Sequence, residues 1–354
     1  MRRAVLLSSL ALMVGLWGCD QGGENGSDLV DFETVFAPPT DVELSAIRAD
    51  WASRDVSAQQ VAVVAEGAID LRFDVSAQVR IVSHRVAGVT HYGAVIIPDG
   101  LAEGAPIMVY SHGGDEGTSV DEAVQVASVL GTEVGRFVYV VPSFRDEPLA
   151  YGEQTFQSDG PASPWDFDVD DALALIEVAL QLEPRADGEQ IGVLGFSRGS
   201  AVALLMAVRD PRIDLVVDYF GPTDFFSPFS QDLMRNALDG EPRDLPGVDV
   251  LTQEYLFPLR DGQLNEAEFR LQLIRRSPLY FAADFPSVQV HHGTADDTVP
   301  VTESDRLAEA IEALGGAAPP FAYFRYEGGE HFPTDLVGSL SRTAAFIVQT
   351  FPTG

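Results

Sequence analysis

A serine flanked by two glycines stands where an apolar run of the sequence passes into an alanine-rich one. The stretch IGVLGFSRGSAVALL, residues 191–205, places Ser197 in the pattern G-x-S-x-G. A serine on a sharp strand-to-helix turn projects its hydroxyl clear of a sheet, and the crowded turn needs small residues two positions before and after it. The following helix also directs free N–H groups and the positive end of its dipole at the turn. Ser197 is therefore a candidate nucleophile.

A serine hydroxyl is a weak nucleophile at neutral pH, so it needs a histidine base and a carboxylate that orients the base. After a serine in this pattern, the acid and then the base follow in chain order. Of the six histidines, only His331 follows a plausible acid and lies in a loop, EGGEHFP. The acid comes from VQVHHGTADDTVP, residues 288–300, where Asp296 and Asp297 both follow a predicted strand.

The rest of the pattern predicts the elements that position these residues. Three strands joined by short turns come first, at residues 61–67, 77–86 and 90–98. Apolar strands then alternate with helices; the strands lie near 105–111, 136–144, 191–196, 213–221, 287–293 and 321–329, and the helices near 118–131, 166–182, 200–210, 303–316 and 334–351. This alternation indicates an α/β protein whose mostly parallel sheet is covered by helices on both faces, with one antiparallel edge.

One segment interrupts the alternation of strands and helices. About sixty residues separate the strands at 213–221 and 287–293, and they are amphipathic and helical in pieces. An insertion at this place lies over the carboxyl ends of the strands, where open α/β sheets bind ligands. We therefore expect a small helical lid at about residues 225–283.

Residues 61–354 resemble the α/β-hydrolase superfamily, in particular the catalytic domain of the prolyl oligopeptidase family and its single-domain esterase relatives. The stretches that carry the resemblance are GFSRGS, SPLYFAADFPSVQVHHGTADDTVPV and GGEHF. The resemblance implies the α/β-hydrolase fold, with Ser197 as nucleophile and His331 as base. In this family the segment H-G-x-x-D-x-x-V-P carries the acid, which selects Asp296 rather than Asp297.

A tetrahedral intermediate also needs hydrogen-bond donors aimed at its oxyanion. One donor is expected to be the backbone N–H of Arg198, the residue after the nucleophile. The second is expected from YSHGGDEG, residues 110–117, which resembles the His-Gly-Gly loop of the superfamily. Its glycines allow a close backbone approach, so we expect the N–H of Gly114 or of Asp115 to serve, with His112 supporting the loop.

Two further clusters contain metal-ligating residue types, but neither predicts a metal site. His291 and His292 are neighbours on a strand and point to opposite faces. Acidic residues that alternate as they enter a helix favour capping and dipole complementation over calcium binding, and here they are Asp166, Asp168, Asp170 and Asp171. We expect no metal and no cofactor, and a structural role for Arg145.

The charge balance restricts the partners of the protein. The chain has 54 acidic and 22 basic residues, which gives a formal net charge of −32, and all the basic residues are arginine. Such a surface repels nucleic acid and anionic lipid headgroups, so we exclude both as partners. Hydrophobic residues make up 46% of the chain, which is ample for a packed core.

The first residues have the character of a targeting segment. Arg2 and Arg3 precede an apolar stretch at residues 4–17 that is too short to span a bilayer comfortably. LWGC then resembles a bacterial lipobox, whose cysteine here is Cys19, the only cysteine of the chain. We expect a signal peptide at 1–18, a lipidated Cys19, a tether and N-terminal segment at 19–60, and a hydrolase domain at 61–354.

The targeting segment predicts export from a bacterial cell and a membrane-anchored lipoprotein in the periplasm or on the cell surface. The alternative is an ordinary secretory signal with an incidental cysteine. In the lipoprotein interpretation, the lipid on Cys19 is the only contact with the membrane. Nothing in the sequence indicates an oligomeric state.

The expected chemistry is acyl transfer to water through a covalent intermediate on Ser197. About forty residues between Cys19 and the first strand leave no room for the β-propeller of prolyl oligopeptidases. The paired glutamates that dipeptidyl members of the family use are not found either. These two differences from the peptidases of the family favour small carboxylic esters as substrates, such as acylated sugars, with short peptides as the alternative. A second alternative is a non-catalytic, surface-anchored binding protein, whose signature would be the loss of a triad residue.

Overall fold

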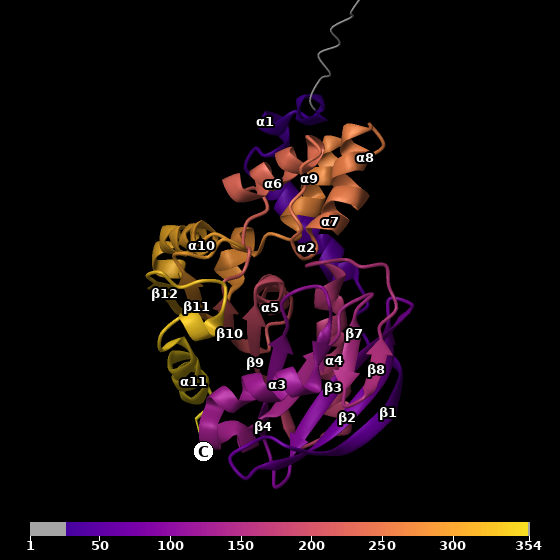
Figure 1. The fold of residues 1–354 in the computed structure, drawn as a ribbon, viewed down its shortest axis with the longest axis vertical. Helices are drawn as coiled ribbons and strands as arrows, with labels where there is room; N and C mark the ends of the chain where they lie inside the picture. The colour runs from indigo at the N-terminus through magenta and orange to yellow at the C-terminus, as the bar shows by residue number, and fades with distance from the viewer. Residues whose placement is uncertain (1–25, 353–354) are drawn as a thin grey trace, which may run out of the picture.

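A nine-stranded sheet forms the centre of the molecule in the computed structural model, which describes residues 26–352 (Figure 1). The predicted signal peptide and Cys19 lie outside the described residues. Across the sheet the strands follow the order β1 (Gln59–Asp70), β2 (Ser76–Val86), β3 (Val89–Pro98), β6 (Val138–Pro142), β4 (Ala105–Ser111), β9 (Ala186–Phe196), β10 (Ile213–Tyr219), β11 (Ser287–Gly293) and β12 (Phe321–Tyr326).

The first three strands pair antiparallel, and β3 also pairs antiparallel with β6. From β6 to β12 all neighbouring strands are parallel. The strands β4 and β6 are buried along their whole length, because helices cover both faces of the parallel part. The expected mostly parallel sheet with an antiparallel edge is confirmed.

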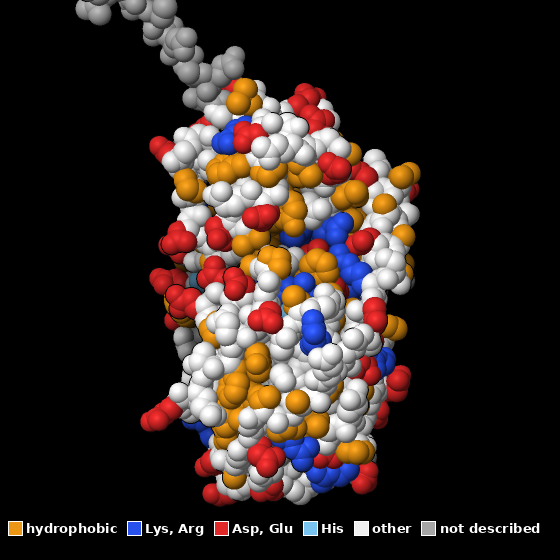
Figure 2. Space-filling model, turned by 90° about the vertical axis from the view of Figure 1, so that its right-hand side faces the viewer, with side chains coloured by type: hydrophobic (Ala, Val, Ile, Leu, Met, Phe, Trp, Pro, Cys, Tyr) orange, Lys and Arg blue, Asp and Glu red, His pale blue; other side chains and the backbone are white. Residues whose placement is uncertain are grey.

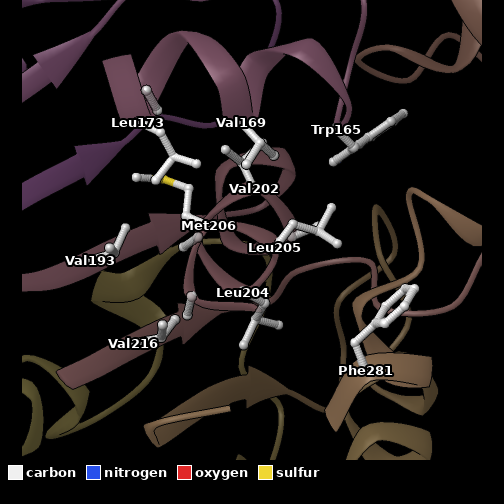
Figure 3. Close-up of a cluster of buried hydrophobic side chains, with 14 of the residues drawn as sticks. Trp165, Val169, Leu173, Val193, Val202, Leu204, Leu205, Met206, Val216 and Phe281 are labelled. Carbon is white, nitrogen blue, oxygen red and sulfur yellow. The ribbon is translucent and has the colours of Figure 1, made fainter. Parts of the chain in front are cut away.

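Helices divide the core into two layers. On one face lie α4 (Phe167–Leu182), α5 (Arg198–Arg209) and α10 (Thr302–Ala313), and on the other lie α3 (Val120–Ala127) and α11 (Ser339–Thr350). Figure 3 shows Leu173 of α4 beside Met206 of α5 and Val169 of α4 beside Val202 of α5. The helix that follows the candidate nucleophile is thus buried between sheet and helix, so its first residue is held rigidly.

The segment between β10 and β11 forms a helical layer over one end of the sheet (Figure 1). It contains α6 (Pro228–Leu238), α7 (Val248–Leu251), α8 (Phe257–Arg260) and α9 (Glu266–Ile274). Short 3-10 and π turns link and flank these helices, with bounds η3 (Thr252–Leu256) and η4 (Pro278–Asp284). This layer is the helical lid expected from the sequence.

Two N-terminal helices join the lid layer, which the sequence pattern did not predict. They are α1 (Phe32–Val35) and α2 (Asp41–Ser53), and both contact α9. Arg270 of α9 ties them down, because its guanidinium donates to the carbonyl oxygen of Val35 at 2.7 Å and to the carboxylate of Glu43 at 2.7 Å. The domain boundary expected at residue 60 stays a prediction, but residues 32–53 pack with the lid.

A small second sheet lies beside α3 and was also not predicted. It consists of β5 (Thr118–Ser119), β7 (Pro148–Tyr151) and β8 (Gln154–Gln157). The remaining short turns are η1 (Gly26–Leu29), η2 (Ser128–Arg136), η5 (Gly315–Ala317) and η6 (Pro333–Asp335). Figure 2 shows acidic side chains spread over the face of the molecule that it presents, in keeping with the formal net charge of −32. Within residues 26–352, no helix has the length and hydropathy needed to cross a bilayer.

Candidate active site

Ser197 occupies a strained turn between β9 and α5. Its backbone has φ 51° and ψ −120°, a conformation that costs a non-glycine residue about 1–3 kcal/mol. Both glycines of the pattern are needed here, because a Cβ on Gly195 would lie 2.5 Å from the carbonyl oxygen of Gly199. A Cβ on Gly199 would overlap the carbonyl oxygen of Ser111 at the end of β4. The packed helix and sheet therefore hold the serine at the turn.

Asp296 and His331 meet after the last two strands. Oδ2 of Asp296 lies 2.6 Å from Nδ1 of His331, while Oδ1 accepts the backbone N–H of Thr298 at 3.0 Å and of Val299 at 2.9 Å. Burial favours the neutral carboxyl, but hydrogen bonds from His292 and His331 outweigh it and hold the pKa of Asp296 well below its usual range. The carboxylate is thus ionised and fixed in orientation.

The alternative acid, Asp297, is exposed. Its backbone carbonyl accepts a hydrogen bond from Arg243 of the lid at 2.9 Å, and within the described part of the chain its side chain makes no contact with His331. Of the two neighbouring aspartates, the structure brings Asp296 to the histidine.

Two cavities meet at Ser197. The larger, of about 1030 Å³, is open to solvent and is lined by Ser197, His331, Gly113 and Gly114. In the described residues Ser197 Oγ makes no hydrogen bond to His331, although both line this cavity. Hydrogen bonds between a nucleophile and its base are often long in ligand-free sites.

The smaller cavity, of about 50 Å³, lies beneath the lid. Ser197 and Arg198 line one side of it, and its other walls are almost entirely apolar. Most of these wall residues come from the lid, among them Phe229, Leu233, Met234, Leu251 and Leu256. Ser197 thus lines both a wide open cavity and a small apolar one.

The glycine loop after β4 lies directly over the turn that carries Ser197. A Cβ on Gly113 would come within 3.0 Å of the carbonyl oxygen of Phe196 and 3.2 Å of Ser197 Cβ. Gly114 has φ +75°, in the left-handed region that favours glycine. The lid touches the same loop, because the N–H of Gly247 lies 3.4 Å from a carboxylate oxygen of Asp115. Of the residues expected as oxyanion donors, Arg198 follows Ser197 directly and Gly114 lines the larger cavity with it, while Asp115 is the next residue of the loop.

The acidic run at the start of α4 does not cap the helix, so the capping part of that interpretation was wrong, although Asp168 and Asp170 do lie in the first turn. Asp166 precedes the first helical residue but its side chain makes no capping hydrogen bond. Burial between α2, α4 and α5 instead requires each carboxylate to have a cationic partner. The ion pairs are Asp166 with Arg54, Asp168 with Arg198, Asp170 with Arg209 and Asp171 with Arg145. The expected structural role of Arg145 fits this network.

The two neighbouring histidines of β11 make separate contacts. Nδ1 of His291 lies 2.7 Å from the hydroxyl of Tyr326, and Nδ1 of His292 lies 2.7 Å from the hydroxyl of Ser304. Both rings are fully buried. Among residues 26–352, no three His, Cys, Asp or Glu side chains are grouped so that they could hold a metal ion.

Glu147 is the residue near the site that the sequence did not indicate. It is buried between Arg198 and His112, with Oε2 lying 3.5 Å from Nε2 of His112. It follows Arg145 in the stretch SFRDEP, where nothing in the residue pattern separates it from its acidic neighbour Asp146. Its position becomes evident only in three dimensions.

Comparison with known proteins supports the fold. No protein-family model matches the sequence, and no curated protein matches it. Among solved structures, acetyl xylan esterase 1 from Thermoanaerobacterium sp. JW/SL YS485 is 18% identical with a TM-score of 0.58, over 89% of this chain and 95% of that one. The Pyrococcus horikoshii acylaminoacyl peptidase is 19% identical with a TM-score of 0.54, over 78% of this chain and 41% of that one.

A puromycin-hydrolyzing peptidase of Mycobacterium tuberculosis is 21% identical with a TM-score of 0.53, over 78% of this chain and 40% of that one. The chain thus spans about two fifths of the length of these peptidases and nearly all of the esterase. These neighbours are α/β-hydrolases of the prolyl oligopeptidase and acetyl xylan esterase types. The predicted α/β-hydrolase fold is confirmed.

Proposed function

We propose that the protein is a serine hydrolase that works through an acyl-enzyme. The observation that carries the proposal is the 2.6 Å hydrogen bond between Asp296 and His331 beside the strained turn of Ser197. Because Asp296 accepts a hydrogen bond from Nδ1–H of His331, Nε2 of the ring is left as the acceptor that a base requires. A non-catalytic binding protein on this fold would have no need of that arrangement.

In the proposed reaction, Ser197 Oγ attacks the substrate carbonyl carbon while His331 Nε2 accepts the hydroxyl proton. The imidazolium that forms is stabilised by Asp296, and the oxyanion accepts the N–H of Arg198 and of Gly114 or Asp115. The imidazolium then donates its proton to the leaving group, and the bond to that group breaks. Water, deprotonated by His331, attacks the acyl-enzyme and releases the acid.

We propose carboxylic esters with a short acyl group as the substrates. The apolar cavity beside Ser197 holds only about 50 Å³, which fits an acyl group of a few heavy atoms. The open cavity of about 1030 Å³ on the other side has room for a bulky alcohol, such as a sugar. The likeness to an acetyl xylan esterase over 95% of its length supports this choice.

Short peptides are the second candidate. The peptidases among the structural neighbours favour this alternative, and the open cavity is wide enough for a short peptide.

For the location of the protein, we propose export from a bacterial cell and attachment to a membrane by a lipid on Cys19. The basic start of the sequence, its apolar stretch and Cys19 support an exported lipoprotein.

The test is turnover of nitrophenyl acetate and of a proline nitroanilide peptide by the purified protein and by Ser197→Ala. We expect the wild type to hydrolyse the ester and the variant to lose at least about 10⁴-fold in kcat. A faster rate on the peptide would select the peptidase alternative. Unchanged turnover by Ser197→Ala would contradict the assignment of the nucleophile.

A further inference from the structure

The side chain of Arg198 is buried beneath the loop that lies over Ser197. Its Nη1 donates to the backbone carbonyl of Gly114 at 3.1 Å and also contacts Glu147. Its Nε and Nη2 both donate to Asp168 Oδ2, at 3.0 and 2.7 Å. The guanidinium therefore links the glycine loop after β4 to two buried carboxylates on other segments.

The preceding carbonyl of the loop is restrained from the same side. Nδ1 of His112 lies 3.0 Å from the carbonyl oxygen of Gly113, and a carbonyl can only accept, so this ring nitrogen carries the proton. The ring is fully buried and stacks on Phe144 with centroids 4.3 Å apart. Two successive carbonyls of the loop are thus held by buried cationic or N–H donors.

The restraint on the carbonyls determines where the N–H groups point. All peptide bonds of the described chain are trans, and in a trans peptide the C=O and N–H point in opposite directions. The peptide that carries the Gly113 carbonyl also carries the Gly114 N–H, and the next peptide joins the Gly114 carbonyl to the Asp115 N–H. Because the carbonyls of Gly113 and Gly114 point toward the buried cluster, the N–H groups of Gly114 and Asp115 point away from it. This is the side on which Gly113 and Gly114 line the larger cavity.

Glu147 completes the cluster. Its Oε1 contacts Arg198, while its Oε2 lies 3.5 Å from Nε2 of His112, and neither Oε2 nor Nε2 has a hydrogen-bond partner among residues 26–352. Because Nδ1 of the ring holds the proton, Nε2 faces Oε2 as a second acceptor. Burial raises the pKa of Glu147 to about 7, so that the carboxyl keeps a proton below neutral pH that it can share with the ring. Burial lowers the pKa of His112 to about 3, so the ring stays neutral.

We propose that Arg198 is a positioning residue of the oxyanion hole. Glu147, Asp168 and His112 hold the Arg198 side chain and the glycine loop in place relative to Ser197. The inference rests on the proposed acyl-transfer function. The residue after the nucleophile then acts twice: its backbone N–H is an oxyanion donor, and its side chain aims the donors of the opposite loop. A substitution of the side chain leaves the backbone donor in place and removes only the second effect.

The test compares Arg198→Gln with Arg209→Gln. Arg209 is a matched control, because it lies on the same helix, its side chain is only 6% exposed, and it pairs with Asp170 of the same acidic run. Its hydrogen bond within residues 26–352 goes to Asp170 and not to the glycine loop. Both variants should lose thermal stability. Only Arg198→Gln should lower kcat, by about 10- to 100-fold, with KM nearly unchanged, because misaligned donors cost stabilisation of the transition state alone.

A boronic acid that forms a tetrahedral adduct with the serine supplies the second readout. Its affinity for Arg198→Gln should fall by the same factor as kcat/KM, since both report the oxyanion hole. Equal kcat for the two arginine variants, or a raised KM with unchanged kcat, would overturn the proposal while leaving the proposed function intact. Absence of ester turnover by the wild type would instead remove the proposed function itself.

Glu147 gives a test that does not depend on removing the guanidinium. Glu147→Gln keeps an acceptor for Arg198 and offers an amide N–H to Nε2 of His112, so we expect kcat within about 3-fold of wild type. Glu147→Ala removes one of the two carboxylate partners of Arg198 and leaves no polar group beside Nε2 of His112, so its kcat should fall at least about 10-fold. If the alanine variant were as active as the glutamine variant, the cluster would have no role in positioning.

Discussion

Asp296 and His331, 35 residues apart in the sequence, are joined by a hydrogen bond of 2.6 Å between Oδ2 and Nδ1. Two backbone N–H groups, of Thr298 and Val299, hold the other carboxylate oxygen. This arrangement fixes both the rotation of the imidazole and its tautomer. It also provides a stabilised negative charge beside the ring at the moment when the ring would become cationic.

Asp296→Asn should lower kcat by about 10³- to 10⁴-fold, because an amide can leave the imidazole in the wrong tautomer. Steady-state kinetics on nitrophenyl acetate measure the loss. The matched control is Asp297→Asn, whose side chain is exposed and should leave kcat within about 2-fold of wild type. A large loss of kcat in Asp297→Asn, with kcat nearly unchanged in Asp296→Asn, would assign the role of the acid to Asp297.

The length of the acyl chain should limit turnover. Since the apolar cavity beside Ser197 has a volume of only about 50 Å³, kcat/KM should fall at least about 10-fold from butanoate to octanoate esters. Leu233→Ala enlarges this cavity and should raise the ratio of octanoate to acetate rates by about 10-fold. The control is Leu340→Ala, which makes the same change on the wall of the larger cavity.

Equal rates from acetate to octanoate in the wild type would contradict the placement of the acyl group. An equal shift of the ratio in Leu340→Ala would contradict it as well, since that residue lines the larger cavity and not the apolar one.

The protein should lose stability as the pH falls below about 6.5. Burial lowers the pKa of His84 to about 4, and the unfolded chain has the ordinary value of about 6.5. Between these values the unfolded state binds the proton and the folded state does not, so each pH unit costs up to about 1.4 kcal/mol of unfolding free energy. Burial also lowers the pKa of His91 and His291 to about 3, which adds to the loss.

His84→Leu isolates one of these contributions. Neither ring nitrogen of His84 has a hydrogen-bond partner within residues 26–352, so the substitution removes a titrating group and no bond. Urea unfolding should show that the free energy of unfolding of His84→Leu falls between pH 6.5 and 4.5 by about 2 kcal/mol less than that of the wild type. An identical acid-induced loss in both proteins would show that His84 already titrates normally in the folded state.

The N-terminal helices should depend on one arginine of the lid. Arg270→Ala removes the bonds to Val35 and Glu43, so it should destabilise the protein by about 2–3 kcal/mol and expose residues 32–53 to hydrogen exchange. Arg260→Ala, on the same lid, breaks a surface pair with Asp261 and a contact with the ring of Phe257, and should cost less than about 1 kcal/mol. Unchanged hydrogen exchange at residues 32–53 in Arg270→Ala would show that the hydrogen bonds of Arg270 are not needed to hold the N-terminal helices on the lid.

Local pattern predicted the central sheet because its strands are apolar on both faces. The strand expected at residues 287–293 is β11, with Ser287 and Gly293 as its ends. The candidate triad came from chain order and from a family resemblance, and its catalytic roles stay predictions. What the structure adds is that Asp296, rather than its neighbour, contacts His331.

Features that depend on distant pairs were not predicted. Arg54 reaches Asp166 across 112 residues, so the acidic run was interpreted as capping α4. The spacing of Ser119 and Glu122 is that of a capping box. Ser119 accepts the N–H of Glu122, but the carboxylate of Glu122 accepts the hydroxyl of Tyr110 at 2.5 Å and does not return to the backbone of Ser119. In each case a local rule was overruled by a partner that only the fold brings near.

The most direct test of the account is to map the site of covalent modification by a fluorophosphonate. After incubation at neutral pH, intact-mass and peptide mass spectrometry should find one adduct, on Ser197, and none on the Ser197→Ala variant. His331→Ala should slow the labelling by at least about 10³-fold, since the serine then has no base. An adduct on another residue, or labelling of Ser197 that does not depend on His331, would contradict the central claim.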